Sequence, residues 1–191
     1  MRNTSDEFDA TVAQVSDSPD GFSNSLKMTT GTPESTVDDN EFYLIEHRIE
    51  AQNLQHLAYG TSSAKATTLS FYVKSSVTGT FGCSFFQPDS VRVISKTYTI
   101  NSANTWERKI ITVVGDTSGV IDNNNETGLF IYWNLGSGAN YDSAPDTTWA
   151  GYTTANFFDS SSSDALVTTA GATWQITGVQ LEAGDTATPF E

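Results

Sequence analysis

The sequence is poor in the residue types on which most catalytic and metal sites depend. Among 191 residues it has one cysteine, Cys83, and two histidines, His47 and His56. A single cysteine excludes an intrachain disulfide, and with two separated histidines it disfavours a zinc site. No nucleophile elbow, phosphate-binding loop or zinc-ligand spacing is present. The sequence therefore predicts a protein that is not an enzyme.

Basic residues are also scarce, and so are long apolar runs. Lys and Arg number 9 against 23 Asp and Glu, which gives a formal net charge of −14. Such a charge repels phosphate backbones and anionic lipid surfaces, so we expect no nucleic-acid partner. No apolar run is long enough to span a bilayer, so we expect no membrane insertion. The acidity serves either calcium binding or solubility in salt, or it is only a solvated surface.

What the sequence does contain is a series of alternating segments separated by turn residues. Apolar residues make up only 37% of the chain, but aromatic residues make up 12%, which suits a thin core between two sheets. Period-two alternation predicts eight strands. They cover residues 22–29, 42–49, 67–74, 80–87, 91–100, 106–114, 129–135 and 174–181. Residues 50–58 are the one segment with a helical pattern.

This pattern is typical of an all-β protein. We expect a jelly-roll β-sandwich of about eight or more antiparallel strands with one short helix, as a single domain over residues 1–191. The alternation predicts a set of buried side chains: Phe71, Phe81, Phe85, Ile131, Trp133 and Ile176. Cys83 shares a strand face with two of these phenylalanines and is expected to be a small buried hydrophobe. In the last strand the apolar residues change face at Gly178, which predicts a bulge there.

A long insertion at residues 136–173 interrupts the strands, and loops of this length are usually functional or disordered. Its first half is rich in aromatic residues with polar neighbours. Sugars stack their C–H faces on exposed rings while neighbouring carboxylates and amides take their hydroxyls. The candidate glycan-binding residues are therefore Trp149, Tyr152, Tyr141, Asp142, Asp146 and Asn156. The alternative is that these rings only fasten the loop to the sandwich.

A second polar segment, residues 116–126, gathers oxygen-bearing side chains. Calcium prefers oxygen ligands, so Asp116 and Asp122 are candidate metal ligands. The segment lacks EF-hand spacing, and a plain hairpin loop explains it as well. No cofactor is expected, and structural calcium is the open alternative.

Several segments together resemble a known domain. These are residues 45–57, residues 69–75, residues 94–100, the pair Trp106-Glu107 and the closing run 174–191. In this order they resemble a jelly-roll, carbohydrate-binding-module-like domain of tail-fibre and virion structural proteins of tailed bacteriophages. The resemblance extends over nearly the whole chain, from about Gly21 onward. Members of that family usually continue on both sides of the domain, so the resemblance implies that this chain is part of a longer protein.

The resemblance implies a function as well as a fold. It implies a surface protein of the virion, in a tail fibre or head appendage, that works by binding rather than by catalysis. Its partners would be other copies of the chain in a trimer, other virion proteins and host surface polysaccharide. Two alternatives remain open: a purely structural or decorating virion module that mediates subunit contacts, and a carbohydrate-binding module of a secreted hydrolase. No catalytic residues are implied, because the matching motifs are strand and core positions.

Overall fold

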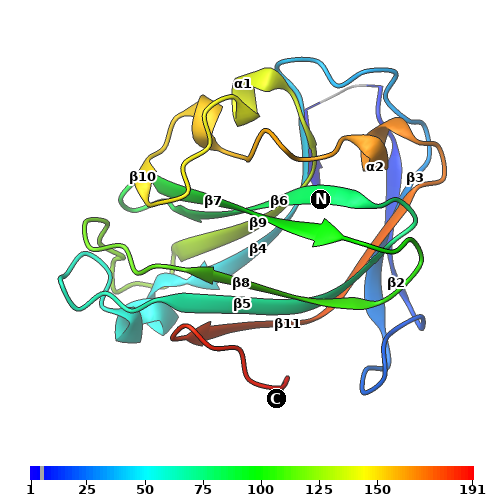
Figure 1. The fold of residues 1–191 in the computed structure, drawn as a ribbon. Helices are drawn as coiled ribbons and strands as arrows, with labels where there is room; N and C mark the ends of the chain where they lie inside the picture. The colour runs from blue at the N-terminus through cyan, green and yellow to red at the C-terminus, as the bar shows by residue number, and fades with distance from the viewer. Residues whose placement is uncertain (5–6) are drawn as a thin grey trace.

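Two antiparallel sheets face each other in the computed structural model, which describes residues 1–4 and 7–191 (Figure 1). The six-stranded sheet has the order β1 (Arg2–Asn3), β4 (Phe42–Glu50), β9 (Thr127–Ser137), β6 (Gly79–Gln87), β7 (Arg92–Ile100) and β10 (Ala150–Gly151). The five-stranded sheet has the order β2 (Ala10–Val15), β3 (Ser25–Thr30), β11 (Thr173–Ala183), β5 (Thr67–Ser75) and β8 (Glu107–Val113). The predicted jelly-roll β-sandwich is therefore confirmed.

The helical elements are short connectors. Residues Ala51–Leu57 form a 3-10 helix, η1, where the sequence predicted the one helical segment. Three further pieces lie in the insertion between β9 and β11: α1 (Ala139–Asp142), η2 (Thr154–Asn156) and α2 (Ala165–Thr168). No helix among the described residues is long and apolar enough to cross a membrane.

The core lies between the sheets and is built from alternate residues of their strands. The predicted core residues Phe71, Phe81, Phe85, Ile131, Trp133 and Ile176 are each at most 6% exposed. The ring of Phe71 in β5 meets the ring of Trp133 in β9 edge to face, with 5.8 Å between centroids. Cys83 is fully buried beside them, and burial raises the pKa of its thiol far above the usual value. It is thus the inert small hydrophobe that the sequence predicted.

The bulge predicted in the last strand is present in β11. The pairing of β11 with β5 shifts register between Thr177 and Gln180, and Gly178 has a φ of +58°. A side chain at this position would collide with Phe22, because an added Cβ would lie 2.5 Å from the end of its ring. The extra residue lets Leu181 pack against the same core as Trp174, although the two stand on opposite faces by simple alternation.

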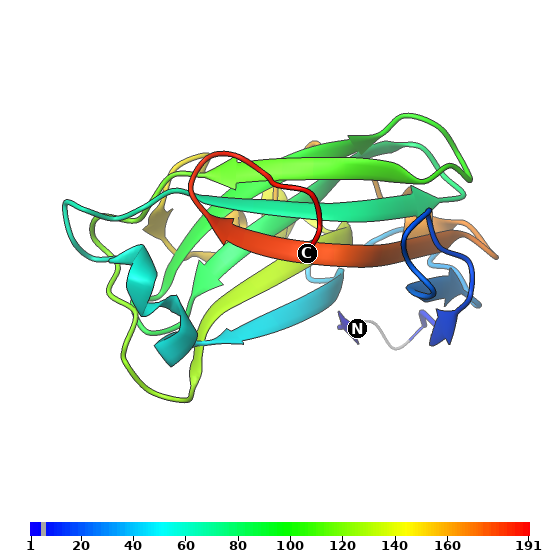
Figure 2. The ribbon, with the colours of Figure 1, turned by 90° about the horizontal axis from the view of Figure 1, so that it is seen from below.

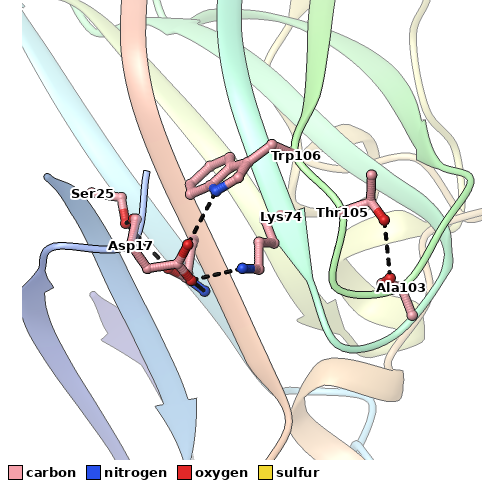
Figure 3. A network of polar contacts seen from close by, with 7 residues as sticks. Asp17, Ser25, Lys74, Ala103, Thr105 and Trp106 are labelled. Atoms are coloured by element: carbon pink, nitrogen blue, oxygen red, sulfur yellow. Dashed lines mark hydrogen bonds and ion pairs between the residues drawn. The ribbon is translucent and has the colours of Figure 1, made fainter. Parts of the chain in front are cut away.

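The outer face of the five-stranded sheet carries two stretches of loop. Asp17, after β2, accepts hydrogen bonds from Lys74 (2.7 Å), Gln175 (3.2 Å) and the Trp106 indole (3.3 Å), three groups from three different strands or their ends (Figure 3). The bond from Lys74 is the main reason that the pKa of Asp17 is lowered. The C-terminal tail folds back over the same sheet (Figure 2), where the Phe190 ring meets Phe22 at 4.9 Å.

The insertion covers the opposite side of the sandwich. Its first part, with α1 and η2, lies over the outer face of the six-stranded sheet (Figure 1), whereas α2 packs against the main core through Leu166 and Val167. The molecule therefore has the order insertion, six-stranded sheet, core, five-stranded sheet and tail. This arrangement gives the six-stranded sheet two apolar faces, and the second of them holds the candidate site.

Candidate functional site

The central strands of the six-stranded sheet carry large apolar side chains on both faces. Ile131 and Trp133 of β9 point into the core, so the alternating residues Phe130 and Tyr132 of the same strand point outward. In the sheet register Phe130 stands between Arg48 of β4 and Phe86 of β6. Tyr132 stands in the next row, opposite Glu46. The outward face is therefore an aromatic platform with charged residues along its β4 side.

The insertion is anchored on this platform by two buried phenylalanines. Phe157 and Phe158 pack with Leu44, Val93 and Tyr132 in an apolar cluster separate from the main core. The hydroxyl of Ser95 donates to the backbone carbonyl of Asn156 at 2.9 Å, and Ser84 donates to that of Phe157. Phe157 and Phe158, in the middle of the insertion, thus fasten it to the sheet, as the alternative interpretation of the loop's aromatic residues expected.

A pocket remains between the insertion and the platform. It has a volume of about 300 Å³ and is lined by Arg2, Phe42, Leu44, Phe86, Tyr132, Tyr141, Tyr152, Thr154 and Phe157. The ring of Tyr152 meets that of Phe86 at 5.2 Å, and the ring of Tyr141 meets that of Phe42 at 5.0 Å. All four rings are half-buried, so each has part of its surface available. The volume is at the lower end of the range usual for small-molecule sites, roughly 300–1,000 Å³.

The lining residue Tyr132 connects the pocket to a neighbouring ring and a charged group on the same sheet face. The rings of Phe130 and Tyr132 are stacked, with centroids 5.4 Å apart and planes 12° from parallel. The Arg48 guanidinium lies 5.2 Å from the centre of the Phe130 ring, at a distance typical of a cation–π contact. Burial, with the nearby charge of Glu46, raises the pKa of Tyr132 to about 12. Its phenol therefore stays protonated at neutral pH and can donate a hydrogen bond.

Two of the predicted glycan-binding residues, Tyr141 and Tyr152, are brought together in this pocket. The other four support the insertion. Asn156 is 4% exposed and donates to Asp146 (2.7 Å) and to the carbonyl of Gly151 (2.9 Å), so these polar groups hold the loop's shape. Asp142 accepts from the Ser137 hydroxyl at 3.0 Å. Burial raises the pKa of Asp142, with the charge of Asp159 adding to the effect.

The structure does not bring Trp149 together with the two tyrosines. Its indole N–H donates to the carbonyl of Val114 at 2.7 Å, and its ring meets Tyr59 at 5.9 Å on the side of the main core. Trp149 does not line the pocket. A ring in a long loop can face either way, and sequence spacing gave no means of choosing.

Sequence reasoning missed the part of the pocket that comes from the sheet. The lining residues Phe86 and Tyr132, with Phe130 beside them, face away from the core on strands that were correctly predicted. Their neighbours in the same strands were correctly placed in the core. The available signal was that both faces of 129–135 are apolar or aromatic, because a strand with one solvated face carries polar residues there. Arg2 could not be linked to the site, since the sequence predicted no strand before residue 22. Phe42 begins the predicted strand 42–49, but no local pattern placed that strand end beside the insertion.

The candidate metal ligands Asp116 and Asp122 lie in different environments, one buried in an ion pair and the other exposed. Asp116 is 1% exposed and forms an ion pair with Arg92, with 2.6 Å between Nε and Oδ2. It also accepts from the Gln87 amide (3.0 Å) and the backbone N–H of Ser118 (3.0 Å). Asp122 is exposed. Within residues 1–4 and 7–191, no three His, Cys, Asp or Glu side chains converge as metal ligands would.

We expect the Asp116→Asn variant to be less stable than the wild type by about 1.5–3 kcal/mol at neutral pH. Burial alone would raise the pKa of Asp116, but hydrogen bonds from Arg92 and from the backbone of Ser118 and Gly119 hold it below its usual value. A lowered pKa in the folded state stabilises the protein above the ordinary carboxyl pKa, and this contribution is lost as the pH falls through the lowered value. The difference in unfolding free energy between wild type and variant should therefore shrink in acid.

Thermal or urea unfolding at neutral and acidic pH measures this difference. Asp122→Asn is the matched control, because its side chain is exposed, and it should change stability by no more than about 0.5 kcal/mol. Calcium should leave the melting temperature of the wild type unchanged. A rise with calcium that is absent in Asp116→Asn would show that Asp116 is a metal ligand after all.

Comparison with known proteins gives distant structural matches. No protein-family model matches the chain, and no curated protein sequence is similar to it. The enzymatically active domain of tailspike protein 4 of bacteriophage CBA120 matches 95% of this chain with 14% identity and a TM-score of 0.49. A CBM4 structure matches 93% with 13% identity and a TM-score of 0.45. The CBM22-1 xylan-binding domain from Paenibacillus barcinonensis matches 93% with 11% identity and a TM-score of 0.41.

These matches differ in how much of the other chain they cover. This chain spans 18% of the tailspike chain, 80% of the CBM4 chain and 83% of the xylan-binding domain. At such identities the likeness concerns the fold alone. With TM-scores below 0.5 it carries no argument about a ligand, which has to come from the pocket itself.

Proposed function

We propose that this protein binds host surface glycans through the pocket under the insertion, without transforming them, as a surface protein of a tailed-bacteriophage virion. The observation that carries the glycan-binding part is the aromatic lining of a pocket on a sheet face that the main core does not use. Four half-buried rings, Phe42, Phe86, Tyr141 and Tyr152, keep part of their surface available there.

The chemistry of such a lining suits a sugar. The C–H faces of a pyranose ring pack on aromatic rings, and its hydroxyls need hydrogen-bonding groups at the edge. Tyr132, Tyr141, Tyr152 and Thr154 supply hydroxyls around the rings. Because the floor belongs to the sheet and the insertion is anchored by buried residues, the pocket is preformed, and little ordering entropy opposes binding.

The same lining supports a binding role rather than a catalytic one. Its described residues include no carboxylate, histidine or cysteine. These are the groups that most often act as general acid, general base or nucleophile at hydrogen-bonding distance from the reacting atoms. The placement on a virion is supported by the resemblance of residues 45–57 and 174–191, among others, to tail-fibre domains.

The test is a glycan array followed by adsorption to host cells. We expect the folded protein to bind a subset of surface glycans and to release no fragments from them. Preference for soluble plant polysaccharides over host glycans would instead favour a module of a secreted hydrolase. Failure of the folded protein to bind any glycan would contradict the proposed function.

One observation favours a second role, as a structural module that contacts neighbouring subunits. The edge strand β2 contains neither a charged residue nor proline, and Thr11 to Gln14 are all exposed. Natural proteins usually protect such edges, since an open edge can pair with a strand of another chain. Native mass spectrometry tests this role: it predicts a symmetric oligomer, with a trimer as the family expectation, and a stable monomer at micromolar concentration would argue against it.

A further inference from the structure

The charge at the pocket is opposite in sign to that of the chain. The chain carries 23 acidic residues against 9 basic ones, yet the described lining of the pocket includes Arg2 and no carboxylate. A second cation, Arg48, lies over the ring of Phe130, which stacks on the lining residue Tyr132. Of the four arginines in the chain, Arg2, Arg48, Arg92 and Arg108, one therefore lines the pocket and a second lies next to its lining. An acidic surface that served only solubility would give no reason for basic side chains to gather at the pocket.

The two arginines share a single carboxylate. Arg48 donates through Nε (3.0 Å) and Nη2 (2.6 Å) to one oxygen of Glu46, and Arg2 donates through Nη1 (3.4 Å) to the other. The group of Arg2, Arg48 and Glu46 thus has a net charge of +1. The arginine side chains remain 58% and 54% exposed, whereas Glu46 is 16% exposed. Each guanidinium has five N–H donors, so most of them are left over for a ligand.

The position of Arg48 is fixed before any ligand arrives. Glu46 accepts two hydrogen bonds from its guanidinium, which also lies 5.2 Å from the centre of the Phe130 ring. Phe130 in turn stacks on Tyr132, which lines the pocket. A side chain held in this way loses less conformational freedom on binding than a free surface arginine. Planar guanidinium groups recognise carboxylates in particular, because two parallel hydrogen bonds can form.

We propose that the ligand of the pocket is an acidic glycan, with its carboxylate bound by Arg48 and Arg2 while a neighbouring sugar ring packs on Phe86 and Tyr152. This inference rests on the proposed glycan-binding function and adds the chemical class of the ligand. The local positive charge has a clear role, because a chain with a net charge of −14 otherwise repels an anionic polymer. At physiological ionic strength the screening length is about 8 Å, so carboxylates farther away are largely screened while the Arg2, Arg48 and Glu46 group of net charge +1 acts at the pocket.

Calorimetric titration with three oligosaccharides of equal length tests the proposal: one of uronic acids, one of the matching neutral hexoses and one carrying sulfate. We expect the uronic-acid oligosaccharide to bind at least roughly tenfold more tightly than the neutral one. Raising the ionic strength to about 1 M, where the screening length is about 3 Å, should remove most of this preference. Tighter binding of the sulfated oligosaccharide than of the uronic one would overturn the assignment of a carboxylate.

Variants separate the arginines from the rest of the pocket. Arg48→Gln should lose roughly tenfold in affinity for the uronic-acid oligosaccharide and keep its affinity for the neutral one, and Arg48→Lys should fall between wild type and Arg48→Gln. Arg108→Gln is the matched control, because Arg108 lies on the other sheet and contacts the carbonyl of Thr188. It should bind as the wild type does. Unchanged melting temperatures confirm that each variant is folded.

The outcomes distinguish this inference from the function on which it rests. Equal binding of the neutral and acidic oligosaccharides, or full acidic affinity in Arg48→Gln, would overturn the acidic ligand and leave glycan binding intact. Binding of none of the three oligosaccharides, together with an empty glycan array, would overturn both.

Discussion

Replacing Phe71 with alanine should lower the free energy of unfolding by about 3–5 kcal/mol, a large part of the roughly 5–15 kcal/mol that stabilises a typical domain. Phe71 is completely buried in β5, where its ring meets Trp133 at 5.8 Å and Tyr98 at 5.2 Å. The truncation removes the ring from between the two sheets and leaves a cavity that a close-packed core cannot collapse to fill. Urea unfolding followed by tryptophan fluorescence measures the loss.

Phe190→Ala provides the same chemical change at an exposed site. The Phe190 side chain is 47% exposed and rests on Phe22 at the outer face of the five-stranded sheet. Removal of that aromatic contact should cost no more than about 1.5 kcal/mol. Similar losses in the two variants would mean that Phe71 does not sit at the centre of the core, and the assignment of strand faces would then be wrong.

Replacing Phe86 with alanine should weaken glycan binding by roughly 30-fold, which corresponds to about 2 kcal/mol. Phe86 is the ring on the floor of the pocket that touches the platform ring Phe130 (6.1 Å) and the wall ring Tyr152 (5.2 Å). Its removal takes away a stacking surface and widens the pocket at once. Titration of the variant with the best ligand from the array measures the effect, with Phe190→Ala as a control for the loss of a phenylalanine elsewhere.

Trp149→Phe decides between the pocket and Trp149, the candidate ring that the sequence analysis named and that lies outside the pocket. This variant keeps an aromatic ring in place of the indole and removes the five-membered ring with the N–H that donates to Val114. It should bind glycan as the wild type does, with a small loss of stability from the missing hydrogen bond, about 1 kcal/mol. If Trp149→Phe loses binding while Phe86→Ala keeps it, the site lies with Trp149 and the pocket is not the binding site.

Much of the fold was predictable because the strands of a sandwich carry their own signal. The eight predicted strands are all present, and burial of Phe71, Phe81 and Phe85 followed directly from alternation. The strand that was missed, β2, has four exposed residues in a row and therefore no apolar face to reveal it. The other two, β1 and β10, are two residues long and exist only because a neighbouring strand lies beside them.

The candidate site was only half predictable, for a physical reason. Tyr141 and Tyr152 were identified because aromatic residues in a polar loop stand out, but a loop's sequence does not say which rings face the sheet. The outward-facing residues Phe86, Phe130 and Tyr132 were overlooked, because the core-facing residues next to them already accounted for the predicted strands. Pairing of Glu46 with both Arg2 and Arg48 depends on a contact between residues 44 positions apart, which no local pattern encodes.

The floor of the pocket belongs to strands that also build the core, whereas its wall belongs to the insertion. Phe86 and Tyr132 stand on strands whose opposite faces build the core, whereas Tyr141 and Tyr152 belong to the insertion. A randomised library confined to Tyr141, Tyr152 and Thr154 would alter the wall while leaving the anchor Phe157 and the strands of the sandwich untouched. Under the proposed function, a new glycan specificity would then need changes in only one continuous stretch of the gene.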